Sequence, residues 1–182
     1  MIGRMSSIDP GLAPPNSWLV TWALVLTWLA VVWAYSPIAD RLATLWFAKP
    51  PDLSAFRALQ QSRGKLVIGI IFAWLLGGFL EELILWGILL QAVKDAASHW
   101  YPSVPATATG VAAAAAAAWV IHLYQGLRAA FIVAQLSVLF GVLFVVGGYN
   151  LWPVILCHGL YDTTAFIRFA NKQPKYSDLH SH

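Results

Sequence analysis

Residues 66–92 read LVIGIIFAWLLGGFLEELILWGILLQA, an apolar run interrupted by two adjacent glutamates. About 20 apolar residues in a helix are enough to cross the hydrocarbon core of a bilayer, so this run predicts a membrane-spanning helix. Glu81 and Glu82 lie well inside it, where an ionised side chain costs about 2.5 to 3.5 kcal/mol to insert. A carboxylate pair at that depth indicates that the helix turns one side toward a cavity or toward other ionisable groups.

The composition of the whole chain is that of a membrane protein. Of its 182 residues, 59% are hydrophobic and 10% are charged, against about 25% charged residues in a soluble domain. Ten tryptophans and six tyrosines suit a protein with two membrane interfaces. The net charge of +3 comes from basic residues beside apolar runs, which predicts membrane topology rather than nucleic-acid binding. The single cysteine, Cys157, cannot form an internal disulfide.

Five apolar runs are long enough to cross a membrane. They cover approximately residues 17–36, 66–92, 106–124, 128–147 and 150–170. The last three are separated by very short connections, which predicts consecutive antiparallel helices. We therefore expect an all-α fold: a polytopic transmembrane helix bundle of about five spans that forms one membrane domain over residues 1–182.

Residues 37–65 differ from the spans because basic and apolar side chains are mixed there. This composition predicts an amphipathic segment on the membrane surface, with a solvated loop as the alternative. Within the segment, Asp52 is predicted to cap a short helix and Gly64 to end it. Residues 171–182 are predicted to form a flexible tail.

The positions of lysine and arginine predict the orientation, because positively charged short loops are retained on the cytoplasmic side. With the N-terminus outside, only Arg4 and Lys94 fall outside. The cations that then fall inside are those of residues 37–65, Arg128, Arg168, Lys172 and Lys175. The expected topology is N-out and C-in.

Five ionisable residues lie well inside the predicted spans. They are Glu81, Glu82, His122, His158 and Asp162. Counted at about 1.5 Å per helical residue, the depths of Glu82, His122 and His158 permit these groups to converge. His158 and Asp162 are four residues apart and share one face of their helix. Glu81 and Glu82 project about 100° apart, so either both reach the cavity obliquely or one supports the other.

This set of groups fits the needs of peptide hydrolysis. A carboxylate beside a second carboxylate can act as a base and then as an acid, His122 can orient the water, and His158 with Asp162 can bind the oxyanion. Glu81, His122 and His158 also match a catalytic zinc ligand set, although the motif HExxH is absent. A proton-coupled transporter is the other alternative, which the lack of an evident inverted repeat disfavours.

Three motifs in order carry a family resemblance: Glu81-Glu82-Leu83-Ile84-Leu85-Trp86, then His122 four residues after Ala118, then His158-Gly159-Leu160-Tyr161-Asp162. They resemble the motifs EExxxR, FxxxH and HxxxN or HxxxD of the CAAX protease and bacteriocin-processing (CPBP) family. That family includes type II CAAX prenyl endopeptidases and bacteriocin-processing or self-immunity proteins. The resemblance covers about residues 66–170, with each motif on its own predicted span.

The resemblance implies an intramembrane endopeptidase that needs no cofactor or metal. Glu81 would be the general base, with Glu82 supporting it; His122 would help to hold the water, and His158 with Asp162 would stabilise the oxyanion. The implied partners are the lipid bilayer of a bacterial or archaeal cytoplasmic membrane and a membrane-associated or lipid-anchored protein or peptide substrate. No nucleic-acid partner is implied.

The chain departs from the family pattern at two positions. Trp86 stands where the first motif has arginine, and Ala118 stands where the second has phenylalanine. These departures leave open a non-catalytic immunity or scaffold protein of the same family. An ionised Asp162 cannot donate to an oxyanion, so this residue must be protonated or must instead orient His158.

Overall fold

The computed structural model describes residues 9–172, and all regular structure in that range is helical. This confirms the predicted all-α fold. The six α-helices are α1 (Trp18–Trp46), α2 (Arg63–Phe72), α3 (Gln91–Ala97), α4 (Ser103–Ile121), α5 (Leu127–Val146) and α6 (Trp152–Ala170). Arg4, Lys175 and most of the predicted tail 171–182 lie outside the described residues.

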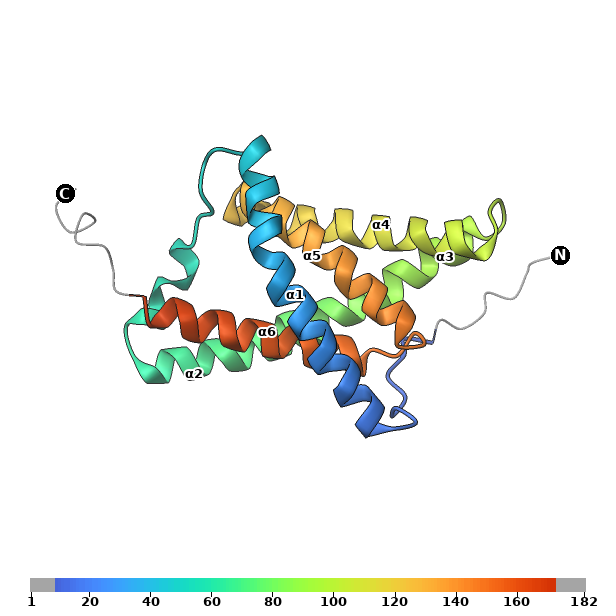
Figure 1. The fold of residues 1–182 in the computed structure, drawn as a ribbon, viewed down its shortest axis with the longest axis horizontal. Helices are drawn as coiled ribbons and strands as arrows, with labels where there is room; N and C mark the ends of the chain where they lie inside the picture. The colour runs from blue at the N-terminus through green and yellow to red at the C-terminus, as the bar shows by residue number, and fades with distance from the viewer. Residues whose placement is uncertain (1–8, 173–182) are drawn as a thin grey trace.

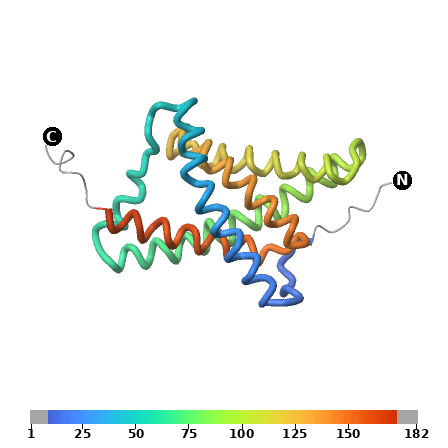
Figure 2. Tube along the Cα trace, in the orientation of Figure 1, coloured from blue at the N-terminus to red at the C-terminus, as the bar shows by residue number. Residues whose placement is uncertain are grey.

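The glutamate-bearing run lies in one continuous helix that extends from Arg63 to Ala97. Between α2 and α3 its backbone is π-helical over η2 (Ala73–Glu81) and η3 (Leu83–Leu90). Such i→i+5 hydrogen bonding is rare and is frequently found at functional sites. Figure 2 shows the first part of this helix, α2 and η2, lying alongside α6, and the second part, η3 and α3, lying alongside α4. The two glutamates fall where η2 meets η3.

Four helices are long and apolar enough to cross a membrane: Trp18–Trp46, Arg63–Ala97, Ser103–Gln125 and Leu127–Val146. Only 11% to 44% of the most apolar window in each is buried inside the protein, so most of its apolar surface faces outward, as a lipid environment requires. The fifth predicted span forms α6, which is not among the four. Its polar residues, among them His158, Asp162 and Arg168, make it less apolar than the others.

The predicted boundary at residue 37 is wrong, because α1 continues through Pro37 to Trp46. Packing against α5 explains the extension: Ala39 and Ala43 are fully buried. Asp40 also accepts two-pronged hydrogen bonds of 2.7 and 2.9 Å from the guanidinium Nη2 of Arg128. Tertiary contacts of this kind override the cost of one lost backbone hydrogen bond at proline.

The N-cap of the surface helix η1 (Ser54–Gln60) is Leu53, so the predicted cap at Asp52 is displaced by one residue. Asp52 Oδ1 accepts a 2.9 Å hydrogen bond from the backbone N–H of Ser54, the first residue of that helix. That bond holds the pKa of Asp52 below its ordinary value. The predicted stop at Gly64 is wrong. The hydroxyl of Ser62 accepts from the backbone N–H of Lys65 at 3.2 Å, which starts α2 and leaves Gly64 inside it.

Helix α6 lies close against η2 because glycines line the contact between them. A Cβ at Gly159 would lie 2.5 Å from ring carbons of Trp74. The indole N–H of Trp74 in turn donates a 3.0 Å hydrogen bond to Thr163. On the opposite side of the contact, a Cβ at Gly78 would already touch the backbone of α6. This close approach brings the polar residues of α6 to the level of the two glutamates.

The substitution Gly159→Ala is therefore expected to lower the free energy of unfolding by about 1 to 3 kcal/mol, because the added methyl group overpacks against the ring of Trp74. Reversible unfolding in mixed micelles measures this change. Gly64→Ala is the matched control. It adds a methyl group on α2 with only Ser62 Oγ at 4.0 Å nearby, so it should be neutral or stabilising by up to about 1 kcal/mol. Equal stability of the two variants would contradict the packing argument.

The basic residues gather toward one end of the molecule. In Figure 1 the C-terminal ends of α4 and α6 and the N-terminal ends of α2 and α5 lie toward the left. These ends carry Arg63, Lys65, Arg128 and Arg168, whereas Lys94 is on α3, toward the opposite end. The arrangement has the charge asymmetry on which the predicted N-out, C-in orientation depends.

Candidate functional site

Three of the five predicted residues form a connected chain of side chains. The carboxylate of Glu82 accepts a short hydrogen bond from Nδ1 of His158, and the other ring nitrogen, Nε2, lies 3.4 Å from Oδ2 of Asp162. The predicted contact between His158 and Asp162 within one helix is confirmed. These side-chain contacts join the η2–η3 junction to α6. Glu82 and His158 are 76 residues apart in the sequence.

Glu82 is the buried member of the glutamate pair, with 2% of its surface exposed. Its Oε1 contacts His158, while Oε2 is buried and has no hydrogen-bond partner among the described residues. The indole Nε1 of Trp86, one turn along the same helix, is likewise buried and without a partner there. A buried carboxylate is tolerated in a membrane protein only where other groups compensate its charge, and His158 does so on one side.

Glu81 is half-buried and differs from its neighbour in its contacts. It interacts electrostatically with Glu82, His122, His158 and Asp162, so its carboxylate lies near the other four predicted residues. Within residues 9–172 its carboxylate has no hydrogen-bonding side chain. A carboxylate that is near other charged groups and is not held by one of them can bind and deprotonate a water molecule.

His122 lies in the helix Ser103–Gln125, at the point where α4 ends and the short helix η4 (His122–Gln125) begins. It is therefore inside a span as predicted, but near the end of that span. Its Nδ1 is 2.9 Å from the carbonyl oxygen of Ala118. Because a carbonyl only accepts, Nδ1 carries a proton, and in the neutral form of the ring Nε2 has a free lone pair. His122 can therefore accept a hydrogen bond from a water molecule at Nε2.

The ring of His158 is fixed on several sides. Phe140 of α5 stacks on it with the ring centroids 5.0 Å apart and the planes at 18°. A Cβ at Gly77 would lie 3.2 Å from Asp162 Oδ2 and 3.6 Å from His158 Nε2, so this glycine leaves the space that the pair occupies. Sequence reasoning missed Phe140, which has no signal in the sequence. For Gly77 the signal was the Gly77-Gly78 pair four residues before the glutamates.

The two ring nitrogens of His158 differ in how firmly they are held. Nδ1 is hydrogen-bonded to Glu82, whereas the 3.4 Å separation of Nε2 from Asp162 exceeds the usual 2.7 to about 3.2 Å range of a hydrogen bond. Nε2–H is thus the ring donor that is left to bind a substrate. Asp162 orients the ring in the meantime.

In the part of the chain that it describes, the structure brings no three of the candidate metal ligands together. Among residues 9–172, no group of three or more His, Cys, Asp and Glu side chains is placed so that it could hold a metal ion. Glu81, His122 and His158, the predicted zinc alternative, are therefore not such a group.

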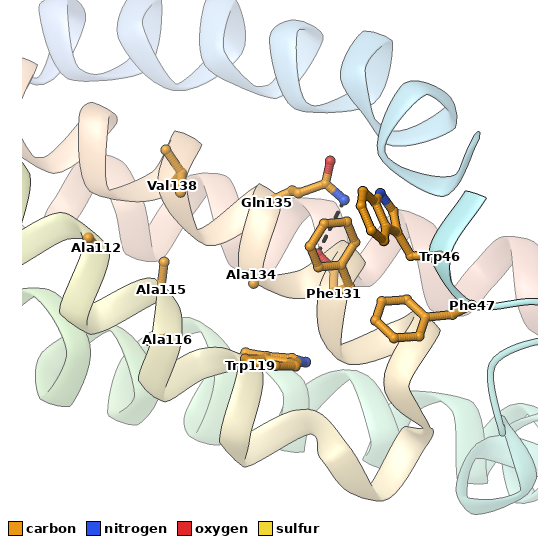
Figure 3. Close-up of a pocket in the computed structure, with 10 residues that line it drawn as sticks. All are labelled: Trp46, Phe47, Ala112, Ala115, Ala116, Trp119, Phe131, Ala134, Gln135 and Val138. Carbon is orange, nitrogen blue, oxygen red and sulfur yellow. Dashed lines mark hydrogen bonds between the residues drawn. The ribbon is translucent and has the colours of Figure 1, made fainter. Parts of the chain in front are cut away.

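A surface cavity of about 660 Å³ lies away from the ionisable groups. Figure 3 shows it between α4, α5 and the C-terminal end of α1. Its lining is apolar except for Gln135, and none of the five predicted residues contributes to it. The side-chain amide of Gln135 is bonded to the carbonyl oxygens of Ala39 and Phe131, which leaves the cavity without reactive groups.

Comparison with known proteins identifies one family. A family model described as type II CAAX prenyl endopeptidase Rce1-like matches residues 63–164, which is more than half of the chain and includes every candidate residue. Neither the comparison with curated proteins nor that with solved structures gave a match.

Proposed function

The chain belongs to the Rce1-like family of type II CAAX prenyl endopeptidases, and from this membership we propose that it is an intramembrane endopeptidase in which Glu81 activates a water molecule. The family is one of proteases, and four helices of the chain are long and apolar enough to cross a membrane. The observation that supports the proposed mechanism best is the contrast between the glutamates. Glu82 is bound to His158, whereas Glu81 is not bound by any side chain that the structure describes.

The proposed reaction moves one proton in two steps. Glu81 takes a proton from a water molecule that also donates to Nε2 of His122, and the resulting hydroxide attacks the carbonyl carbon of the scissile bond. Nε2–H of His158 donates to the oxyanion that forms. Glu81 then gives the proton to the leaving nitrogen as the C–N bond breaks. The products are a new carboxyl terminus and a new amino terminus.

The proposed substrate is a membrane-associated or lipid-anchored protein, because the candidate groups lie on helices within the bundle. The family description names prenylated CAAX proteins. A leader peptide, a C-terminal sorting tail or an immunity target is chemically equivalent at the scissile bond. We propose that the protein acts in the cytoplasmic membrane of a bacterium or archaeon, with its N-terminus outside.

Comparison of membrane proteomes from cells with and without the protein tests the proposed function. One membrane-bound precursor is expected to accumulate in its unprocessed form when the protein is absent, and wild-type protein should restore its processing. If no precursor changes in length, the endopeptidase proposal fails.

A non-catalytic immunity or scaffold protein is the competing function, and the two departures from the family motifs favour it. One of these departures, Ala118, gives this alternative less support. The backbone carbonyl oxygen of Ala118 accepts a hydrogen bond from His122, and this contact does not depend on the side chain at position 118. A scaffold protein would keep its biological function as the well-folded variant Glu81→Gln, whereas the proposed enzyme would lose it.

Metal removal distinguishes the proposed mechanism from zinc catalysis. We expect activity to survive exhaustive chelation and the purified protein to contain far less than one zinc ion per chain, because the candidate groups do not form a three-ligand site. Elemental analysis and a cleavage assay after chelation measure this. Stoichiometric zinc, with loss of activity on chelation and rescue by added zinc, would overturn the mechanism but not the peptidase assignment.

A further inference from the structure

We propose that Trp86 is a positioning residue that donates its indole N–H to the second carboxylate oxygen of Glu82. Glu82 would then be bound at both oxygens, by His158 of α6 at Oε1 and by Trp86 of its own helix at Oε2. The contact itself is independent of the proposed function; only its consequence for catalysis rests on that function.

The first observation is a matched pair of unsatisfied polar atoms. Oε2 of Glu82 and Nε1 of Trp86 are the only two buried side-chain polar atoms without a partner within residues 9–172. One is an acceptor and the other is a donor. The indole also lies near enough to Glu82 to act on its carboxylate. Since buried polar groups are nearly always hydrogen-bonded, and an unpaired one costs about 1 to 3 kcal/mol, a small side-chain rotation that pairs these two atoms is favourable.

The second observation is that both side chains are confined. Trp86 is 1% exposed and Glu82 is 2% exposed, so bulk water does not compete for either atom. Gly141 of α5 makes room for the indole: a Cβ there would lie 2.9 Å from ring carbon Cζ3 of Trp86. The ring is thus seated by tertiary packing one helical turn beyond Glu82, where residues i and i+4 are neighbours.

A neutral donor at this position has a distinct electrostatic consequence. The indole N–H can fix the rotation of the carboxylate without neutralising its charge. The charge of Glu82 is then left to interact with His158, which keeps the imidazole oriented for the oxyanion. Trp86 would act on the reaction through Glu82 and His158, without touching the substrate.

Nuclear magnetic resonance of the ¹⁵N-labelled full-length protein in micelles tests the contact without any substrate. The chain has ten tryptophans, and Trp86→Phe identifies the signal of Trp86 as the indole N–H resonance that disappears. If that variant does not fold, substitution of the other tryptophans assigns the signal by elimination. We expect Glu82→Gln to shift the Trp86 indole proton more than any other indole proton, and Glu81→Gln, the matched control, to shift it less. A Trp86 signal that stays in place in Glu82→Gln, or moves equally in both variants, would overturn the proposal.

A kinetic measurement tests the consequence for catalysis. With a farnesylated CAAX peptide as the probe in proteoliposomes, Trp86→Phe is expected to lower kcat about tenfold, roughly the effect of one lost hydrogen bond to a charged group, and to leave KM unchanged. Trp46→Phe changes a 77% exposed tryptophan and should leave both constants unchanged. An unaltered kcat in a folded Trp86→Phe protein would refute the positioning role. Failure of the wild-type protein to cleave the peptide would count against a prenyl substrate, and the magnetic resonance result would still decide on the contact.

Discussion

Replacing Glu81 with glutamine is expected to reduce precursor cleavage by about a thousandfold, within the 10²- to 10⁴-fold range of general acid–base catalysis. Glutamine has nearly the same shape but cannot take a proton from water. Because the carboxylate of Glu81 is half-buried and is not bonded by a described side chain, the substitution should leave the free energy of unfolding nearly unchanged. The cleavage rate in proteoliposomes and the unfolding curve of the same sample measure both effects.

Asp95→Asn is the matched control for this loss of a carboxylate. Asp95 is exposed on α3 and its only ion pair is a 3.9 Å contact with Lys94, among the residues that the structure describes. Its substitution should change neither cleavage nor stability. Full activity of Glu81→Gln would show that another group activates the water, and Glu82 would become the first candidate to examine.

Replacing His158 with alanine is expected to abolish cleavage and also to lower the free energy of unfolding by about 3 to 5 kcal/mol, because removing one partner of a buried ion pair strands the other. The stranded group is Glu82, whose side chain is 2% exposed and contacts His158 through Oε1. Unfolding in mixed micelles and the cleavage assay, applied to one preparation, measure both losses.

The double variant Glu82→Leu, His158→Leu separates stability from catalysis. Replacing a buried pair with apolar residues of similar volume is often neutral or stabilising, so stability should return while activity does not. His99→Ala is the control for loss of an imidazole, since His99 is exposed at the end of α3. If the His158→Ala protein were as stable as the His99→Ala protein, His158 would not stabilise the buried carboxylate of Glu82.

Much of the site could be predicted from the sequence because cost and spacing are visible there. Ionisable residues inside apolar runs identify themselves by their insertion cost, and the four-residue spacing of His158 and Asp162 places them on one helix face. The pairing of Glu82 with His158 could not be predicted. It depends on the distance between η2 and α6, which the packing of Trp74 on Gly159 sets.

Other features were missed because local patterns do not encode them. The π-helical backbone of η2 and η3 leaves no distinct periodicity in a run that is apolar on all sides. Pro37 predicts a helix end, yet contacts between α1 and α5 carry the helix past it. The change from α4 to η4 at His122 has no signal in the sequence either, because the apolar run continues to Tyr124 while α4 ends at Ile121.

Hydrolysis by the purified protein in H₂¹⁸O tests whether this chain is itself the peptidase. The wild-type protein is reconstituted alone with its membrane-bound precursor and allowed a single turnover. The mass of each cleavage product is then measured by mass spectrometry. We predict two products, with one ¹⁸O atom in the new carboxyl terminus of the upstream product and none in the downstream product. A precursor that stays intact with the wild-type protein, although cells containing that protein process it, would contradict the claim that this chain is the peptidase.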